Sequence, residues 1–527
     1  MPATLPTHEV LNQPPPLLGA NAFDADPALR EALAREGGAW GEDRCREIGS
    51  LVWSEEADEH CRRAQRNIPK LHTHDRFGHR IDQVEYDHGF HWMLRQGIDR
   101  GLHSLPWADP RPGAHVVRAA MFAIYNQLDT GPACPVSINY AAVPTLRQSP
   151  ELAARWEERA MRPDYGSYAQ AGMVMTEKQG GSDLRANTTV AEPVGDGWYE
   201  LTGHKWFCTH PVFEFFFTLA HTQAGPTCFV AERGPGFELQ RLKDKLGGRS
   251  LASSEVEFRR LPARVLGEEG RGIRAMIAQI GPTRLDTLLG IAGILRRAVA
   301  EAVHHCRHRG AFGGPLAEQP AMRNVLSDLA IESEAATAAA LRVARAWDGD
   351  GELPFRRLGT AVMKYWVCKR AAAAAAEALE CLGGNGYIEE APLARLYRDI
   401  QIGTVWEGSG NVMALDVLRA VRTDPAALDA FLAECDAARG ADARLDHFLA
   451  RTRRSVEALS GPHPQWNARR TVEDLALALE ASLLVRHAPA AVADAFCAAR
   501  LGDGGLAFGT IPDGIDDDTI LNRALEV

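Results

Sequence analysis

The chain has 527 residues, which is more than one hydrophobic core usually organises, so we expect roughly three or four packed units. Hydrophobic residues make up 46% and charged residues 24% of the chain, as in a soluble globular protein, and a net charge of −11 argues against wholesale coating of nucleic acid. The sequence contains no apolar run of about 18 residues, so no membrane span is expected. Ten cysteines without a C-x-x-C pair, and no secretory segment at the start, favour reduced thiols and a cytoplasmic location.

Along the chain, the pattern of apolar residues changes several times. The opening stretch contains Pro14-Pro15-Pro16 and is expected to be an irregular arm, and helical spacing begins at about Pro27. The predicted segments are an arm (1–35), a helical N-terminal domain (36–168), a middle β domain (169–268), a helical bundle (269–420) and a C-terminal helical extension (421–527). Together they predict an α+β fold with a β-rich segment between helical ones.

Within the middle domain the apolar period falls toward two. Residues 197–203, 227–233 and 254–258 are therefore predicted to be strands bounded by glycine and proline. In the bundle, the run Ala371–Ala376 consists of the strongest helix former. It predicts a tightly packed helix that stops at Gly383-Gly384.

A glycine-containing stretch, residues 173–183, holds the first candidate binding residues. Gly180 and Gly181 allow a bulky ligand to approach the backbone, and Thr176 and Ser182 offer hydroxyl groups. This combination suits a cofactor with a polar ring edge and a phosphate. An ordinary polar turn between two strands explains the same residues about equally well.

The strand that follows contains Trp206, Phe207 and Thr209. Adjacent aromatic rings are able to stack on a flat heterocycle, and Thr209 would share a strand face with Phe207. Packing in the core is the competing explanation for the two aromatic residues.

A single carboxylate, Glu407, lies between Trp406 and a Gly-Ser-Gly-Asn turn, just before an amphipathic run. At a helix entry, free backbone N–H groups could receive an anion or a polarised carbonyl. Taken alone, a helix-start glutamate that complements the macrodipole is the simpler reading.

Several motifs occur together, and in this order they resemble the acyl-CoA dehydrogenase family of flavoproteins. They are Thr-Glu-x-x-x-Gly-Ser-Asp (176–183), Gly-x-Lys-x-x-x-Thr (203–209), Lys-Leu-Gly-Gly-Arg (245–249), Leu-Gly-Glu-Glu-Gly-Arg-Gly (266–272), Arg-Gly-Ala-Phe-Gly (309–313), Leu-Gly-Gly-Asn-Gly-Tyr (382–387) and Trp-Glu-Gly (406–408). Within this family the chain resembles the AidB branch, which belongs to the adaptive response to DNA alkylation. The resemblance rests on details of three motifs, on the Asn-Gln-Pro-Pro-Pro arm (12–16) and on the segment after about 420.

The resemblance implies the family's α+β fold, with a β-sandwich or barrel between helical domains, and FAD as the cofactor. Met175 and Thr176 would meet the pyrimidine edge of the flavin, Ser182 the phosphate region, Phe207 the ring face and Thr209 the edge near N5. The turn around Glu407 would add Val405, Trp406, Ser409 and Asn411.

A second group of residues would contact the FAD of a neighbouring subunit, which implies a homo-oligomer, expected to be a tetramer. Its members are Arg309, Phe312, Gly383 and Gly384. The chain departs from the family where a glutamine is usual, because Pro320 stands there and Gln319 precedes it.

Glu407 matches the family's catalytic base, which removes the α-proton of an acyl-CoA thioester while the β-hydride moves to flavin N5. Gly408 would let the thioester approach, and Arg284 would lie near the substrate, although pairing with a carboxylate explains Arg284 equally well. Some family members carry the catalytic base at the position that Thr283 occupies here, and a threonine cannot serve as that base. The electron acceptor is expected to be an electron-transfer flavoprotein or oxygen.

Two functions therefore compete: dehydrogenation of a short or branched acyl-CoA, and AidB-type protection or binding of double-stranded DNA with vestigial dehydrogenation. For DNA, a strip within 444–470 carries six arginines, which a solvated helix face with ion pairs also explains. Its arginines are Arg444, Arg451, Arg453, Arg454, Arg469 and Arg470. No metal site is expected, because the two histidine groups, near 72–79 and 304–308, lack cysteine or carboxylate partners at ligand spacing.

Overall fold

The computed structural model describes residues 5–527, so the first four residues of the predicted arm lie outside the described residues. The chain divides into two compact units. One, here called the sheet unit, contains residues 56–290 and 406–408. The other, the bundle unit, contains the chain up to Glu55, residues 291–405 and residues 409–527. The five segments predicted above subdivide these units, and their boundaries stay predictions.

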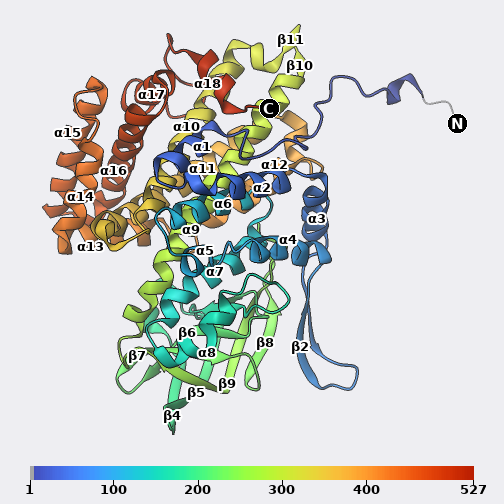
Figure 1. Ribbon diagram of the computed structural model, residues 1–527, viewed down its shortest axis with the longest axis vertical. Helices are drawn as coiled ribbons and strands as arrows, with labels where there is room; N and C mark the ends of the chain where they lie inside the picture. The colour runs from blue at the N-terminus through green and yellow to red at the C-terminus, as the bar shows by residue number, and fades with distance from the viewer. Residues whose placement is uncertain (1–4) are drawn as a thin grey trace. The chain divides into compact units, whose positions relative to one another are not determined.

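The sheet unit contains all of the long strands (Figure 1). Its elements are α3 (Glu55–Arg66), β1 (Lys70–His74), β2 (Arg80–Glu85), α4 (His88–Asp99), α5 (Leu105–Ala108), α6 (Ala114–Tyr125), α7 (Thr130–Leu146), α8 (Pro150–Ala160), β3 (Ala171–Val174), β4 (Val190–Gly195), β5 (Trp198–Thr209), β6 (Phe215–Thr222), β7 (Gly225–Glu232), β8 (Phe237–Leu242), β9 (Ser253–Leu266) and the first half of α9 (Gly272–His308). The predicted strands at 197–203, 227–233 and 254–258 are confirmed as parts of β5, β7 and β9.

Seven strands form one sheet in the order β3-β6-β4-β5-β9-β7, with β8 on β9. Because β6 also pairs with β7, the pairings close a barrel-like circuit. Successive side chains of β6 point to opposite faces. Phe215 and Phe217 pack with Trp156 of α8, whereas Phe216 packs with Phe258 inside the sheet. The continuous apolar run of β6 therefore fills two cores at once.

A two-stranded hairpin interrupts the helices of the N-terminal region, where the sequence predicted helical spacing throughout. Strand β1 pairs with β2 in antiparallel register, with Leu71 opposite Val84. Most of its side chains are exposed or half-buried. The expectation of a wholly helical stretch between about 27 and 160 is wrong at this hairpin.

The bundle unit is helical apart from one short two-stranded ribbon among its described residues. Its elements are α1 (Pro27–Arg35), α2 (Glu42–Val52), the second half of α9, β10 (Gly310–Ala311), β11 (Gly314–Pro315), α10 (Pro320–Arg345), α11 (Leu353–Cys381), α12 (Pro392–Ile400), α13 (Gly410–Thr423), α14 (Pro425–Asp436), α15 (Ala443–Glu457), α16 (Pro464–His487), α17 (Ala490–Phe496) and α18 (Asp517–Ala524), with short 3-10 turns between some of them.

Two helix boundaries follow directly from the sequence. Helix α11 contains the alanine run and ends at Cys381, and Gly383 then adopts a φ of 56°, so the predicted stop at the glycine pair is confirmed. Helix α10 begins at Pro320, where the missing N–H costs nothing because the first turn has no acceptor for it.

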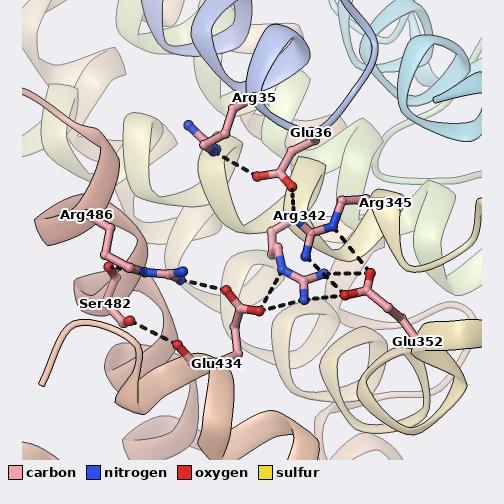
Figure 2. Close-up of polar contacts among 8 residues, drawn as sticks. All are labelled: Arg35, Glu36, Arg342, Arg345, Glu352, Glu434, Ser482 and Arg486. Atoms are coloured by element: carbon pink, nitrogen blue, oxygen red, sulfur yellow. Dashed lines mark hydrogen bonds and ion pairs between the residues drawn. The ribbon is translucent and has the colours of Figure 1, made fainter. Parts of the chain in front are cut away.

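An ionic network ties the C-terminal helices into the bundle unit (Figure 2). Arg342 of α10 has only 4% of its side chain exposed, and it donates to Glu434 of α14 at 2.6 Å and to Glu352 at 2.9 Å. Glu434 also accepts from Arg486 of α16 at 2.6 Å. Arg345 joins Glu352 to Glu36 near the end of α1, at 3.0 Å from each. The network thus connects four segments that are far apart in the sequence.

Among residues 5–527, no helix combines the length and the hydrophobicity that a membrane span requires.

Candidate active site

The turn that carries Glu407 has an unusual backbone. Glu407 adopts a φ of 56° and Gly408 a φ of 106°. The left-handed region costs a residue with a β-carbon about 1–2 kcal/mol, and such conformations gather at functional sites. Residues 406–408 pack with the sheet unit, although their chain neighbours on both sides belong to the bundle unit.

Helix α9 donates hydrogen bonds to both the side chain and the backbone of Glu407. The Thr283 hydroxyl donates to Glu407 Oε2 at 2.6 Å, and Arg284 Nε donates to the Glu407 carbonyl oxygen at 3.0 Å. Arg284 therefore lies beside Glu407, and the bond described here goes to the backbone of Glu407. Thr283, which cannot act as a base, instead donates a hydrogen bond that orients the Glu407 carboxylate.

Two opposite charges act on the Cys134 thiol of α7. Burial raises the pKa of Cys134 to about 12, the positive charge of Lys245 acts to lower the pKa, and the Glu407 carboxylate acts to raise it. Both charges therefore lie within electrostatic range of Cys134.

The loop after β3 is organised around Glu177, which is fully buried. Its carboxylate accepts from Lys205 Nζ at 2.8 Å, from Thr188 N at 2.6 Å and from the Thr189 hydroxyl at 2.6 Å. These bonds fix the backbone next to Thr176, the predicted cofactor contact.

Gly181 closes the same loop against Thr176. A β-carbon at Gly181 would meet Thr176 Oγ1 at 2.4 Å, so only glycine fits at this position without displacing the hydroxyl. Met175 and Thr176 are half-buried, and Ser182 is exposed. The Thr176 carbonyl accepts from Trp206 N at 2.8 Å, which joins the loop to strand β5.

Strand β5 contains a bulge at the two aromatic residues. Lys205 pairs with Val256 and Cys208 with Ser254, so three steps along β5 oppose two along β9. Trp206 and Phe207 therefore lie together opposite a single residue of β9. The residues on either side of them, Lys205 and Cys208, are buried. Phe207 keeps 47% of its surface exposed.

These features fit a flat heterocycle with a polar edge. The half-exposed ring of Phe207 provides a stacking surface, the half-buried Thr209 offers a hydroxyl, and the Gly181 turn allows close approach to Thr176. The sheet unit contains Met175, Thr176, Ser182, Phe207, Thr209, Arg284, Trp406, Glu407 and Gly408.

The other predicted residues belong to the bundle unit. They are Arg309, Phe312, Gly383, Gly384, Val405, Ser409 and Asn411. Phe312 is 95% exposed and has a φ of 54°. Arg309 donates to the Asn12 carbonyl, and the Asn12 amide exchanges two hydrogen bonds with Gly310, at 2.7 and 2.8 Å. The predicted arm thus contacts the turn that carries Arg309.

Sequence reasoning missed Glu177, Lys205, Lys245 and Ser253. The first three lie in motifs that were recognised, but their partners become visible only once the strands are paired. Among residues 5–527, no group of three or more His, Cys, Asp or Glu side chains is arranged to hold a metal ion.

Three family descriptions match the chain in sequence order. Residues 12–167 match the adaptive response protein AidB N-terminal domain, residues 172–261 the acyl-CoA dehydrogenase middle domain, and residues 270–422 the acyl-CoA dehydrogenase C-terminal domain.

Individual proteins agree with these matches. The putative acyl-CoA dehydrogenase AidB of Escherichia coli K12 is 39% identical over 515 residues, 94% of each chain. The structure of Caenorhabditis elegans ACDH-11 in complex with C11-CoA superposes with a TM-score of 0.87 at 24% identity, covering 95% of this chain and 94% of that one. A glutaryl-CoA dehydrogenase of Mycobacterium smegmatis in complex with FADH2 superposes with a TM-score of 0.61 at 18% identity, covering 74% and 96%.

Proposed function

The chain belongs to the AidB branch of the acyl-CoA dehydrogenase family, and from this premise we propose that it dehydrogenates a short or branched acyl-CoA at the α,β-bond with FAD as cofactor. The observation that carries the proposal is the Glu407 carboxylate, which Thr283 orients at 2.6 Å on a strained turn within the unit that also holds Thr176, Phe207 and Thr209. The complexes of relatives with C11-CoA and with FADH2 support the same substrate class and cofactor.

Glu407 would remove the α-proton of the thioester. The Glu407 N–H would help to polarise the acyl carbonyl, and Gly408, which has no side chain, would let the thioester approach. Arg284 fixes the carbonyl of Glu407 and would hold this turn in place while the substrate binds. FAD, when bound, supplies the acceptor for the β-hydrogen and its two electrons at N5.

Thr176, Ser182, Phe207, Thr209, Met175 and Trp406 would hold the flavin within the sheet unit. Val405, Ser409 and Asn411, which belong to the bundle unit, are proposed cofactor contacts as well. Arg309, Phe312, Gly383 and Gly384 would bind the FAD of a second subunit in a homotetramer. An electron-transfer flavoprotein or oxygen would reoxidise the cofactor in the cytoplasm.

Purified protein is expected to be yellow, with the visible bands of oxidised flavin and about one FAD per chain. The exposed Phe207 ring and the Thr176 loop provide a stacking surface and a polar edge that fit the flavin ring. Absorbance after desalting measures the stoichiometry. A colourless protein that takes up no added FAD under native conditions would contradict the proposal.

DNA binding is the second candidate function, and the ion pairs weaken it. Arg444 contacts Asp442 and Asp494, Arg451 contacts Asp474 at 2.7 Å, and Arg453 contacts Asp436. What favours DNA binding is Trp466, which is 89% exposed, with the exposed Arg470 one turn later on α16.

If DNA binds, affinity for duplex should be independent of sequence and should fall steeply between low and moderate salt. Replacing Arg454 and Arg470 by alanine should weaken DNA binding more than replacing Arg451 and Arg453. The reason is that Arg451 and Arg453 already form ion pairs with aspartates. Titration of a labelled duplex by fluorescence anisotropy measures both effects. Absent binding at low salt, or equal affinities for the two double variants, would remove the DNA proposal for this strip.

A further inference from the structure

Lys245 opens the Lys-Leu-Gly-Gly-Arg stretch, which the resemblance matches without assigning it a role. Its ammonium group is half-buried and donates to the Leu251 carbonyl oxygen at 2.7 Å and to Ser253 Oγ at 3.2 Å. Both acceptors lie at or just before the start of β9. The side chain therefore folds back from its own loop onto the edge of the sheet.

Ser253 connects Lys245 to the strand that carries the flavin contacts. Its side chain is buried, with 4% exposed, and its Oγ lies 3.3 Å from Thr209 Oγ1. Ser253 and Thr209 are direct partners in the pairing of β5 with β9. The register of the two strands thus fixes a hydrogen-bonded chain from Lys245 through Ser253 to Thr209.

The charge of Lys245 also reaches the region of the proposed base. Lys245 and Glu407 act in opposite directions on the pKa of the Cys134 thiol, so both charges lie close to it. The ammonium is thus hydrogen-bonded to Ser253, the partner of Thr209, and lies within electrostatic range of the same thiol as Glu407. A positive charge at such a point favours any group nearby that gains negative charge.

We propose that Lys245 is a positioning residue that orients the Thr209 hydroxyl through Ser253 and stabilises the negative charge gained by the flavin when it accepts a hydride. In this step the β-hydrogen leaves carbon with two electrons and joins flavin N5, and the α-proton goes to the Glu407 carboxylate. The flavin therefore gains one negative charge, and Glu407 becomes neutral. This inference rests on the proposed function.

The test measures the equilibrium between oxidised and reduced flavin against a reference dye, without substrate, in the FAD-loaded full-length protein. Lys245→Met should shift this equilibrium roughly tenfold toward the oxidised form, because a charge near the ring is lost. Lys245→Arg keeps the charge and should stay within about twofold of the wild type. Ser253→Ala keeps the charge but breaks the relay, and it should change the equilibrium less than Lys245→Met while altering the visible flavin bands.

Arg249→Met is the matched control, because it removes an exposed positive charge from the same motif, and it should leave the equilibrium unchanged. If Lys245→Met binds FAD and has the wild-type equilibrium, the inference is overturned while the proposed function stands. If Lys245→Met does not fold, wild-type flavin bands and equilibrium in Ser253→Ala would overturn the relay. A wild-type protein that binds no FAD would instead overturn the proposed function.

Discussion

Glu407→Gln is expected to slow the anaerobic reduction of the bound flavin by isovaleryl-CoA, or a similar short acyl-CoA, by about 10²–10⁴-fold. Glutamine keeps the size and the hydrogen-bonding oxygen of the side chain, so Thr283 can still donate to it. It cannot accept the α-proton. Stopped-flow absorbance of the oxidised flavin band measures the rate.

Two further variants separate the loss of the base from general damage. Thr283→Val removes the hydrogen bond that orients the carboxylate and should reduce the rate by a smaller factor than Glu407→Gln. Glu407→Gln should retain FAD, because its change lies at one end of the site. Reduction at the wild-type rate in Glu407→Gln would show that the base lies elsewhere.

Lys205→Met is expected to lower the free energy of unfolding by about 3–5 kcal/mol, because it leaves the Glu177 carboxylate buried without its ion partner. Both side chains of the pair are fully buried, and Lys205 Nζ also donates to the Leu219 carbonyl oxygen at 2.7 Å. The Thr176 loop should loosen as well, so FAD affinity should fall. Urea denaturation followed by fluorescence measures the change.

The pair also predicts how stability depends on pH. Burial alone would raise the pKa of Glu177, but the charge and hydrogen bond of Lys205, with bonds from Thr188 and Thr189, hold this pKa at about 2. A carboxyl group whose pKa is lowered on folding stabilises the protein above its unfolded pKa, near 4.5. The contribution of Glu177 should therefore be complete above pH 4.5 and disappear as the pH falls toward 2.

Lys205→Met combined with Glu177→Gln should recover part of the lost stability, because no uncompensated charge then remains buried. Arg162→Met serves as the control, since its ion pair with Glu158 is solvent-exposed and should contribute less than about 0.5 kcal/mol. Equal stabilities for Lys205→Met and Arg162→Met would contradict the argument.

Much of the fold could be predicted because local pattern and tertiary packing agree. The alanine run of α11 and the strands β5, β7 and β9 have the spacing that their burial requires. The β1–β2 hairpin could not be predicted in this way, because it presents no continuous apolar face: His72, His74 and Arg80 are exposed. Without a buried face, the period of two that marks a strand is absent from the sequence.

Only part of the candidate site could be predicted, because some of its residues stand out by their sequence neighbours and others only by their contacts in the fold. Glu407, Thr176 and Phe207 were singled out by their neighbours in sequence. The support around them depends on contacts across strands and between helices, such as Thr283 with Glu407 and Ser253 with Thr209. The bulge at Trp206 and Phe207 depends on the register of β5 against β9, which a single strand does not reveal.

The network around Arg342 makes α10 and α14 depend on each other. Glu434 belongs to α14, and the charges of Arg342 and Arg486 hold its pKa at about 2 even though burial acts to raise it. Among the described ion pairs, loss of Glu434 would leave the buried Arg342 with Glu352 alone, and loss of Arg342 would leave Glu434 with Arg486 alone. Because removing one partner of a buried ion pair is costly, the two helices are expected to unfold as one cooperative unit.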